Sequence, residues 1–259
     1  MISNDYIELI DTKNYFGYPV CVYRFKKHDE LKDELLKRVT IDSMSNGNYI
    51  RSVPDAKPIL EYTDNHAISE LRTAYQKAYD HFYTDVLDCD LSFDDEDKPY
   101  KTLTKSKPII TQSWFVRVPP INNVKNENGD SCVMPMSMHT HFLSPVCGAY
   151  YLNIERQVGD GGNLVFGQPQ CDHMLSYVIR DCLRAKGSIK YYEIHEIHES
   201  EIVLWAGVLP HTIEAQRNMS SERVSIITNS IVTPLMNGHR TYNYNMSAFN
   251  ANGEYYTDE

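Results

Sequence analysis

The sequence of residues 138–154 is MHTHFLSPVCGAYYLNI, and it predicts both a β-rich fold and a metal site. Its second half is rich in β-branched and aromatic residues, which fit the pleated, half-buried surface of a strand. In a strand, residues i and i+2 point to the same face, so the two imidazoles of an HxH step, His139 and His141, can reach one metal ion. We therefore predict strands over residues 134–141 and 146–154, with a metal bound at the first.

Short runs of the same kind continue on both sides of this stretch and predict further strands. Two segments with leucines or other apolar residues at helical spacing come earlier in the chain and predict helices over residues 28–39 and 67–87. Many short strands after N-terminal helices predict an α+β, mainly β fold. We expect a double-stranded β-helix (jelly roll) with the helices packed on the major sheet. The other predicted strands are residues 18–25, 108–118, 163–166, 201–206, 211–215 and 223–232.

A chain of 259 residues is long enough for one domain with a sizeable core. We expect a single domain over residues 1–259. Its parts are an N-terminal strand and helices (1–107), a jelly-roll core (108–234) with an insertion around 168–192, and a polar tail (235–259) that could form a lid.

The net charge of −10 argues against non-specific binding to nucleic acid or to an anionic membrane, both of which favour basic surfaces. The sequence contains no run of 18 apolar residues, so it predicts no transmembrane helix, and the N-terminus has no secretion-signal pattern. The six cysteines are scattered without a CxxC pair, which favours reduced thiols. We therefore expect a cytoplasmic protein.

His211 is the best candidate for a third metal ligand. It follows an apolar strand and a turn (202–210), a placement that puts a histidine at a strand start facing the sheet interior. Farther on, Arg223 and Ser225 share one face of a predicted strand. Together they can hold a carboxylate through a bidentate ion pair and a hydrogen bond. The alternative interpretations are histidines that are ordinary polar groups and an arginine on a strand surface.

Four sequence blocks in a fixed order resemble the 2-oxoglutarate- and Fe(II)-dependent oxygenases of the prolyl-hydroxylase-like superfamily. They are MHTHFLSPVCGAYYLNI (138–154), GDGGNLVFGQP (159–169), ESEIVLWAGVLPHTIEAQ (199–216) and ERVSIITNSIV (222–232). The similarity covers residues 114–232 and implies a double-stranded β-helix with iron bound at the strand ends.

The resemblance also implies roles for residues of this chain. His139 and His211 would be catalytic iron ligands, Arg223 would pair with the far carboxylate of 2-oxoglutarate, and Ser225 would assist. Tyr151 would hydrogen-bond to the co-substrate, or it could simply be a core residue.

The implied activity is that of an Fe(II)/2-oxoglutarate-dependent dioxygenase, a hydroxylase that uses dioxygen and releases succinate and CO2. Its substrate would be a small molecule or an amino-acid-like group. Two alternatives remain open. One is a cupin-like three-histidine metalloprotein that does not use 2-oxoglutarate and acts as a dioxygenase or an isomerase. The other is a non-catalytic jelly-roll module.

His141 departs from the wider superfamily, whose first step is usually HxD or HxE. Three neutral imidazoles would leave the metal site more positive by one unit and strengthen the binding of an anionic co-substrate. Alternatively, His141 turns aside and leaves an open position, or Asp130 or Asp160 fills it. We favour direct ligation by His141.

Several other residues have weaker patterns. Asn153 and Asn229 could line the pocket or cap strand ends, and we favour the strand ends. His195 and His198 could bind zinc, but their acidic surroundings favour a solvated edge. Cys147 is most simply a small buried residue rather than a nucleophile.

Overall fold

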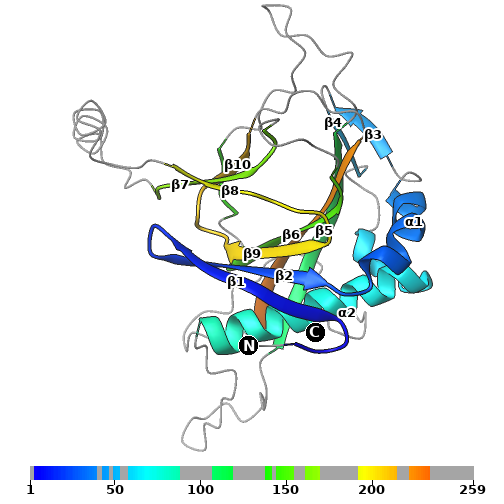
Figure 1. The fold of residues 1–259 in the computed structure, drawn as a ribbon, viewed down its shortest axis with the longest axis horizontal. Helices are drawn as coiled ribbons and strands as arrows, with labels where there is room; N and C mark the ends of the chain where they lie inside the picture. The colour runs from blue at the N-terminus through cyan, green and yellow to red at the C-terminus, as the bar shows by residue number, and fades with distance from the viewer. Residues whose placement is uncertain are drawn as a thin grey trace, which may run out of the picture.

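The computed structural model describes residues 3–39, 58–87, 107–118, 138–141, 144–154, 161–169, 192–214 and 222–233, together with the backbone of 43–46 and 49–52. These residues form two antiparallel sheets with helices on one side (Figure 1). The small sheet has the order β10 (His211–Ile213), β7 (Leu164–Gly167), β8 (Tyr192–His195). The large sheet has the order β1 (Ile7–Tyr15), β2 (Tyr18–Phe25), β9 (Glu201–Ala206), β6 (Val146–Asn153), β11 (Arg223–Thr233), β5 (Lys107–Val118), β4 (Tyr49–Ser52), β3 (Ser43–Asn46).

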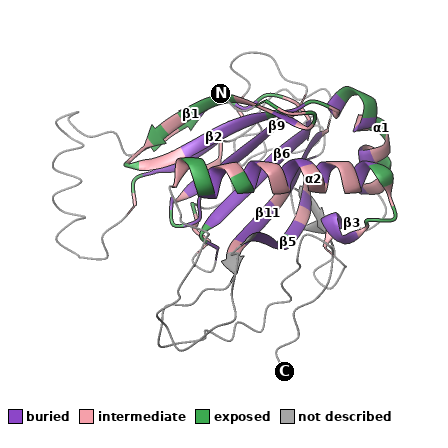
Figure 2. Cartoon of the chain, turned by 90° about the horizontal axis from the view of Figure 1, so that it is seen from below, coloured by how far each residue is buried: buried purple, intermediate pink, exposed green. Residues whose placement is uncertain are grey.

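Two helices cover one face of the large sheet. Helix α1 (His28–Val39) buries Leu31, Leu35 and Val39, while α2 (His66–His81) lies across β9, β6 and β11 (Figure 2). The N-cap of α2 is Asn65, whose side chain accepts a hydrogen bond from the backbone N–H of Ile68, as a helix start requires. After α2 the chain continues as a π-helical turn, Phe82–Val86.

A ladder of three tyrosines, two on α2 and one on the π-helical turn after it, fixes this helix to β11. The hydroxyl of Tyr75 donates to the Ile226 carbonyl at 2.7 Å, and those of Tyr79 and Tyr83 hydrogen-bond to the hydroxyls of Thr228 and Ser230 at 2.7 and 3.2 Å. Four helical residues rise about 6 Å and two strand residues about 6.8 Å, so tyrosines spaced by four can meet alternate strand residues. The ladder therefore sets both the position of α2 and the register of β11 beneath it.

The central strands are buried on both faces because the helices cover one face and the small sheet covers the other. In β9, for example, Leu204 packs in the core beneath the helices, whereas Trp205 packs in the core between the sheets. This explains why β6 and β9 are continuous apolar runs rather than alternating ones.

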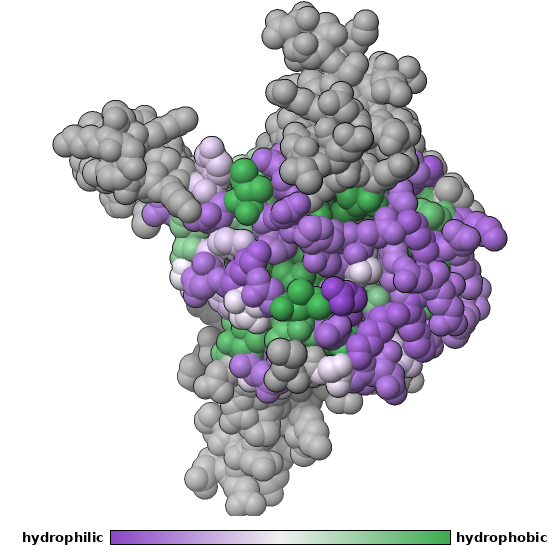
Figure 3. All heavy atoms as spheres, viewed as in Figure 1, coloured by the Kyte–Doolittle hydropathy of each residue, from purple (hydrophilic) through white to green (hydrophobic). Residues whose placement is uncertain are grey.

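Hydrophilic side chains dominate the described surface on the face drawn in Figure 3. Within the described ranges, no helix is long and apolar enough to cross a membrane.

The structure confirms the mainly antiparallel β class and the packing of N-terminal helices on the large sheet. The double-stranded β-helix and the domain limits stay predictions. The insertion core (170–191) and the tail (234–259) lie outside the described residues. Strand β1 was missed because its sequence is largely polar, and β3 and β4 were not predicted either.

The prediction of a solvated edge at His195 is wrong. His195 is 2% exposed and packs against Tyr15 and Phe166, although its neighbours in sequence, Ile194 and Glu196, are exposed. Side chains alternate between the two faces of β8, so that His195 points to the buried face although Ile194 beside it points to solvent. Burial, followed by the charge of Lys13, lowers the pKa of His195 to about 4.

This burial predicts a pH-dependent loss of stability. The folded pKa lies below the unfolded value of 6.5, so the unfolded chain takes up the proton first and stability falls as pH drops from about 6.5 towards 4. His195 should contribute up to about 1.4 kcal/mol per pH unit to that fall. Urea unfolding at several pH values should show a shallower pH dependence for His195→Gln than for the wild type. Equal slopes would contradict the burial, and His198→Gln, which changes an exposed histidine, is the control.

Candidate metal centre

The three predicted histidines converge. His139, His141 and His211 each offer a ring nitrogen, and these atoms all lie within 4.8 Å of one another. The ring centroids are 4.5 Å apart for His139 and His211, 5.1 Å for His141 and His211, and 5.2 Å for His139 and His141. Such a cluster fits one ion bound by three imidazoles.

Backbone pairing brings these residues together. His139 and His211 form an isolated antiparallel bridge in which each backbone N–H donates to the other residue's carbonyl, at 3.1 and 2.9 Å. His139 thus pairs along β10, the outer strand of the small sheet. The HxH step lies outside any regular strand, contrary to the prediction of a strand there, but its two imidazoles still reach one point.

His141 is placed by a tight turn over Gly207. The backbone N–H of His141 donates to the Gly207 carbonyl at 2.8 Å, and the N–H of Gly207 donates to the Pro145 carbonyl at 2.9 Å. A Cβ at position 207 would lie 1.8 Å from the backbone oxygen of Ser144. Glycine is therefore required here so that the two backbone segments can approach.

Burial keeps two of the candidate ligands neutral. It lowers the pKa of His211 to about 3 and that of His141 to about 4, and the neighbouring histidines act in the same direction. Neutral imidazoles carry the lone pair that a metal needs, so protons do not compete for these two residues near neutral pH. Three imidazoles suit iron, zinc, copper or nickel, and the site therefore fits the iron that the sequence resemblance implies.

Supporting contacts fix the orientation of the rings. Nδ1 of His211 lies 3.0 Å from the Leu209 carbonyl and 3.2 Å from Nε1 of Trp205. These two contacts belong to different tautomers, because Nδ1 cannot donate and accept at once. Metal binding through Nε2 selects the tautomer in which Nδ1–H donates to Leu209.

Asn229 is held by Gln112, to whose side chain its amide nitrogen donates at 2.8 Å. The Asn229 side chain opposes the lowering of the His141 pKa. Asn229 lies inside β11 and is buried, so the prediction that it caps a strand end is wrong.

Both tryptophans of the chain contact ligand histidines. Trp114 stacks on His141 with ring centroids 6.0 Å apart, and Trp205 meets His211 edge-on at 4.9 Å. Neither was predicted as a site residue, because nothing local in the sequence links them to the histidines.

Arg223, Ser225 and Tyr151 gather on the same inner face. Ser225 pairs directly with Tyr151 across β11 and β6, and the Arg223 guanidinium carbon lies 5.6 Å from the Tyr151 ring centroid. Arg223 and Ser225 alternate with Val224, which packs under the helices, so their side chains face the space between the sheets. All three are at most 4% exposed.

The adjacent carboxylate of Glu222 is held on the other face. Arg117 donates to both of its oxygens at 2.9 Å. The Arg223 guanidinium, on the inner face, thus follows in sequence a carboxylate that is already paired with Arg117.

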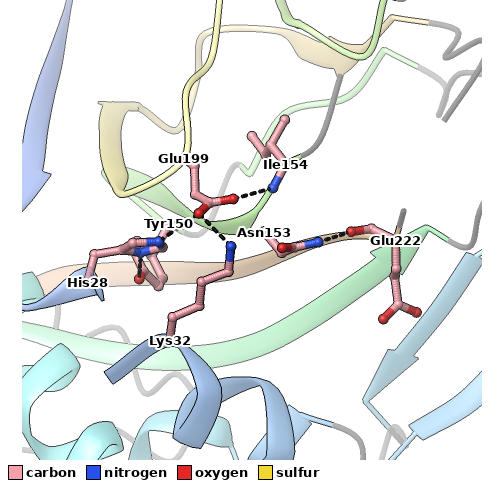
Figure 4. A network of polar contacts seen from close by, with 7 residues as sticks. All are labelled: His28, Lys32, Tyr150, Asn153, Ile154, Glu199 and Glu222. Atoms are coloured by element: carbon pink, nitrogen blue, oxygen red, sulfur yellow. Dashed lines mark hydrogen bonds and ion pairs between the residues drawn. The ribbon is translucent and has the colours of Figure 1, made fainter. Parts of the chain in front are cut away.

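A polar network secures the strand ends that carry Arg223 and Tyr151 (Figure 4). The Glu199 carboxylate accepts hydrogen bonds from Lys32 at 2.6 Å and from the backbone N–H of Ile154 at 3.0 Å. Asn153, the last residue of β6, donates to the Glu222 carbonyl, in agreement with its predicted place at a strand end.

The residues of β5 on the inner face are partly exposed. Gln112 is exposed and Trp114 and Val116 are half-buried, whereas the alternate residues Ser113 and Phe115 are buried under the helices. His139 and His141 are half-buried and His211 is buried.

No protein-family model matches this chain, and no curated protein matches it in sequence. Solved structures with a similar chain path include a 2OG-Fe(II) oxygenase family oxidoreductase from Burkholderia pseudomallei, at 11% identity over 78% of this chain and 77% of that one, TM-score 0.44. A Pseudomonas putida prolyl-4-hydroxylase is similar at 12% identity over 85% and 90%, TM-score 0.43. HygX from Streptomyces hygroscopicus, solved with nickel and 2-oxoglutarate bound, is similar at 13% identity over 82% of each chain, TM-score 0.44. With a likeness of this degree, the function is inferred from this chain's own residues.

The alternative ligands Asp130 and Asp160 lie outside the described residues, as do Cys89, Cys132, Cys171 and Cys182. Cys21 and Cys147 are free and buried. Burial raises the pKa of the Cys147 thiol to about 12, which agrees with a structural rather than a nucleophilic role.

Substituting Gly207→Ala tests how the site is built. The new Cβ must displace the turn after His141, so we expect a loss of about 1–3 kcal/mol in the free energy of unfolding and weaker metal binding. Urea unfolding and titration with Ni(II), followed by tryptophan fluorescence, measure both. Val208→Ala, at an exposed neighbouring position, is the control and should change stability by no more than about 0.5 kcal/mol. Wild-type metal affinity in Gly207→Ala would contradict the role of the turn.

Proposed function

We propose that this protein is an Fe(II)- and 2-oxoglutarate-dependent dioxygenase, a hydroxylase acting on a small-molecule or amino-acid-like substrate. The observation that carries the proposal is the convergence of three imidazoles on an inner face that also presents Arg223, Ser225 and Tyr151. A double-stranded β-helix built from the two sheets is part of the proposal, as are a cytoplasmic location and a single domain.

His139, His141 and His211 would hold the iron. When bound, Fe(II) with 2-oxoglutarate and dioxygen supplies an oxidation that releases succinate and CO2 and inserts oxygen into the substrate. Because all three protein ligands are neutral, they cancel none of the metal's positive charge, which favours binding of the anionic keto-acid end of the co-substrate.

Arg223 would pair with the far carboxylate of 2-oxoglutarate. A buried guanidinium can donate two parallel hydrogen bonds to a carboxylate, and the Ser225 and Tyr151 hydroxyls, on the same face, can add one each. The strand register supports a division of the site into an anion-binding end and a metal-binding end. Trp114 and Ile227 pair across β5 and β11, and they lie between Arg223, at the anion-binding end, and Asn229, at the metal-binding end. This anion site favours 2-oxoglutarate over the cupin-like and non-catalytic alternatives.

Metal ligation by His141 is tested by the iron content of variants. After anaerobic loading with Fe(II), we expect His141→Ala to lose iron more severely than the roughly 10–100-fold weakening that follows loss of a supporting residue. His139→Ala and His211→Ala should behave alike, and exposed His198→Ala is the matched control. Full iron retention in His141→Ala would show that His141 turns aside.

Co-substrate binding is tested on Arg223. Charge-assisted hydrogen bonds contribute about 1.5–3 kcal/mol, so Arg223→Gln should raise the Kd for 2-oxoglutarate by roughly 10–100-fold while iron content stays the same. Arg117→Gln removes an arginine from the opposite face and should leave that Kd unchanged. Thermal shift measures binding, and succinate release measures turnover. If 2-oxoglutarate neither stabilises the iron-loaded wild type nor yields succinate, the proposed function is wrong.

A further inference from the structure

A line of aromatic rings leads away from the metal centre between the two sheets. Trp205 meets His211 at 4.9 Å, Phe166 lies 5.8 Å from Trp205, and Tyr15 stacks on Phe166 at 5.2 Å, all between ring centroids. Trp205 and Phe166 are at most 1% exposed, whereas Tyr15, at the end of β1, is half-buried. The line therefore joins a buried ligand to a residue near solvent.

The order of side chains in this line suits electron transfer. Tryptophan and tyrosine lose one electron at potentials that biological oxidants reach, but phenylalanine does not. Phe166 would act only as a bridge in contact with both partners. Electron tunnelling falls steeply with distance, so rings in contact provide a far better route than the surrounding aliphatic core.

His195 supplies what the tyrosine at the end of the line needs. A tyrosine gives up its electron readily only when its phenolic proton can leave with it. The Tyr15 hydroxyl lies 3.4 Å from Nδ1 of His195, which packs edge-on against both Tyr15 and Phe166. Burial lowers the pKa of His195 to about 4. An oxidised phenol is a far stronger acid than that, so the neutral His195, in the tautomer protonated at Nε2, can still accept the proton.

We propose that Trp205, Phe166, Tyr15 and His195 form an electron-transfer path that protects the metal centre when an oxidant is generated there without substrate. The proposal rests on the proposed function, which would supply a redox-active metal and dioxygen at the histidines. One electron would pass from Trp205 to an oxidant formed there. One electron then passes from Tyr15 through Phe166 to Trp205, while the Tyr15 proton moves to His195. The resulting tyrosyl radical regains one electron from a soluble thiol or ascorbate and its proton from His195.

The path can be tested in the metal-free protein by laser flash photolysis. Trp114→Phe leaves Trp205 as the single tryptophan, and a pulse at the red edge of tryptophan absorption photoionises it. Decay of the tryptophan radical should coincide with the rise of a tyrosyl radical. Adding Tyr15→Phe should remove most of that tyrosyl signal, and adding Phe166→Leu or His195→Gln should slow its rise.

Tyr18→Phe is the matched control, because Tyr18 pairs with Tyr15 across the same hairpin and makes none of the ring contacts in this line. An unchanged tyrosyl yield in Tyr15→Phe, or an equal loss in Tyr18→Phe, would overturn the path. Thermal unfolding of each variant confirms that it is folded.

A second experiment tests protection. Iron-loaded protein is incubated with 2-oxoglutarate and dioxygen but no substrate, and peptide mass spectrometry follows oxygenation of Trp205. Tyr15→Phe should accumulate oxygenated Trp205 faster than wild type or Tyr18→Phe. Equal rates together with succinate release would overturn protection. An absence of succinate would instead overturn the proposed function and, with it, protection at the iron, while the photolysis result still decides the path.

Discussion

Strand β11 is held by the tyrosine ladder of α2 and the π-helical turn after it, and the candidate site depends on that constraint. Tyr75, Tyr79 and Tyr83 hydrogen-bond to Ile226, Thr228 and Ser230, all inside the core. Because side chains alternate along a strand, fixing one set of positions on the helix side also fixes the other set, including Arg223, Ser225 and Asn229, on the site side. A slip of one residue would exchange the two sets and bury the ladder partners in the site.

The histidines depend on a second backbone constraint at the edge of the small sheet. The bridge between His139 and His211 sets the first and last ligands opposite each other, and the turn over Gly207 brings His141 to the same point. The ring of His211 is then oriented by the Leu209 carbonyl. Main-chain hydrogen bonds thus determine where the three histidines are, and this carbonyl favours the tautomer of His211 that leaves Nε2 free for a metal.

Much of the candidate site could be predicted because its signals are local. The HxH step and the Arg-x-Ser step each depend on the two-residue period of an extended chain, which is visible in a single sequence. Runs of β-branched and aromatic residues predicted most of the strands, and the apolar stripe of helical spacing predicted α1 and α2. Residues without such a period were missed, including the polar strand β1, Trp114 and Gly207, whose role depends on the distant oxygen of Ser144. His195 was misjudged because its exposed neighbours conceal a buried position.

The sequence by itself determined the chemical groups that are available, which are three imidazoles, an arginine and hydroxyls. It also determined that the two histidines of the HxH step share a face, as do the arginine and serine of the Arg-x-Ser step. Tertiary structure alone decided that these pairs face the same space, because β10, β6 and β11 come together only through sheet pairing and helix packing. It also decided that both tryptophans lie against ligand histidines and that rings from β9, β7 and β1 form one line to Tyr15. Local periodicity specifies the direction of a side chain, whereas its neighbours across the core depend on long-range contacts that no short stretch of sequence contains.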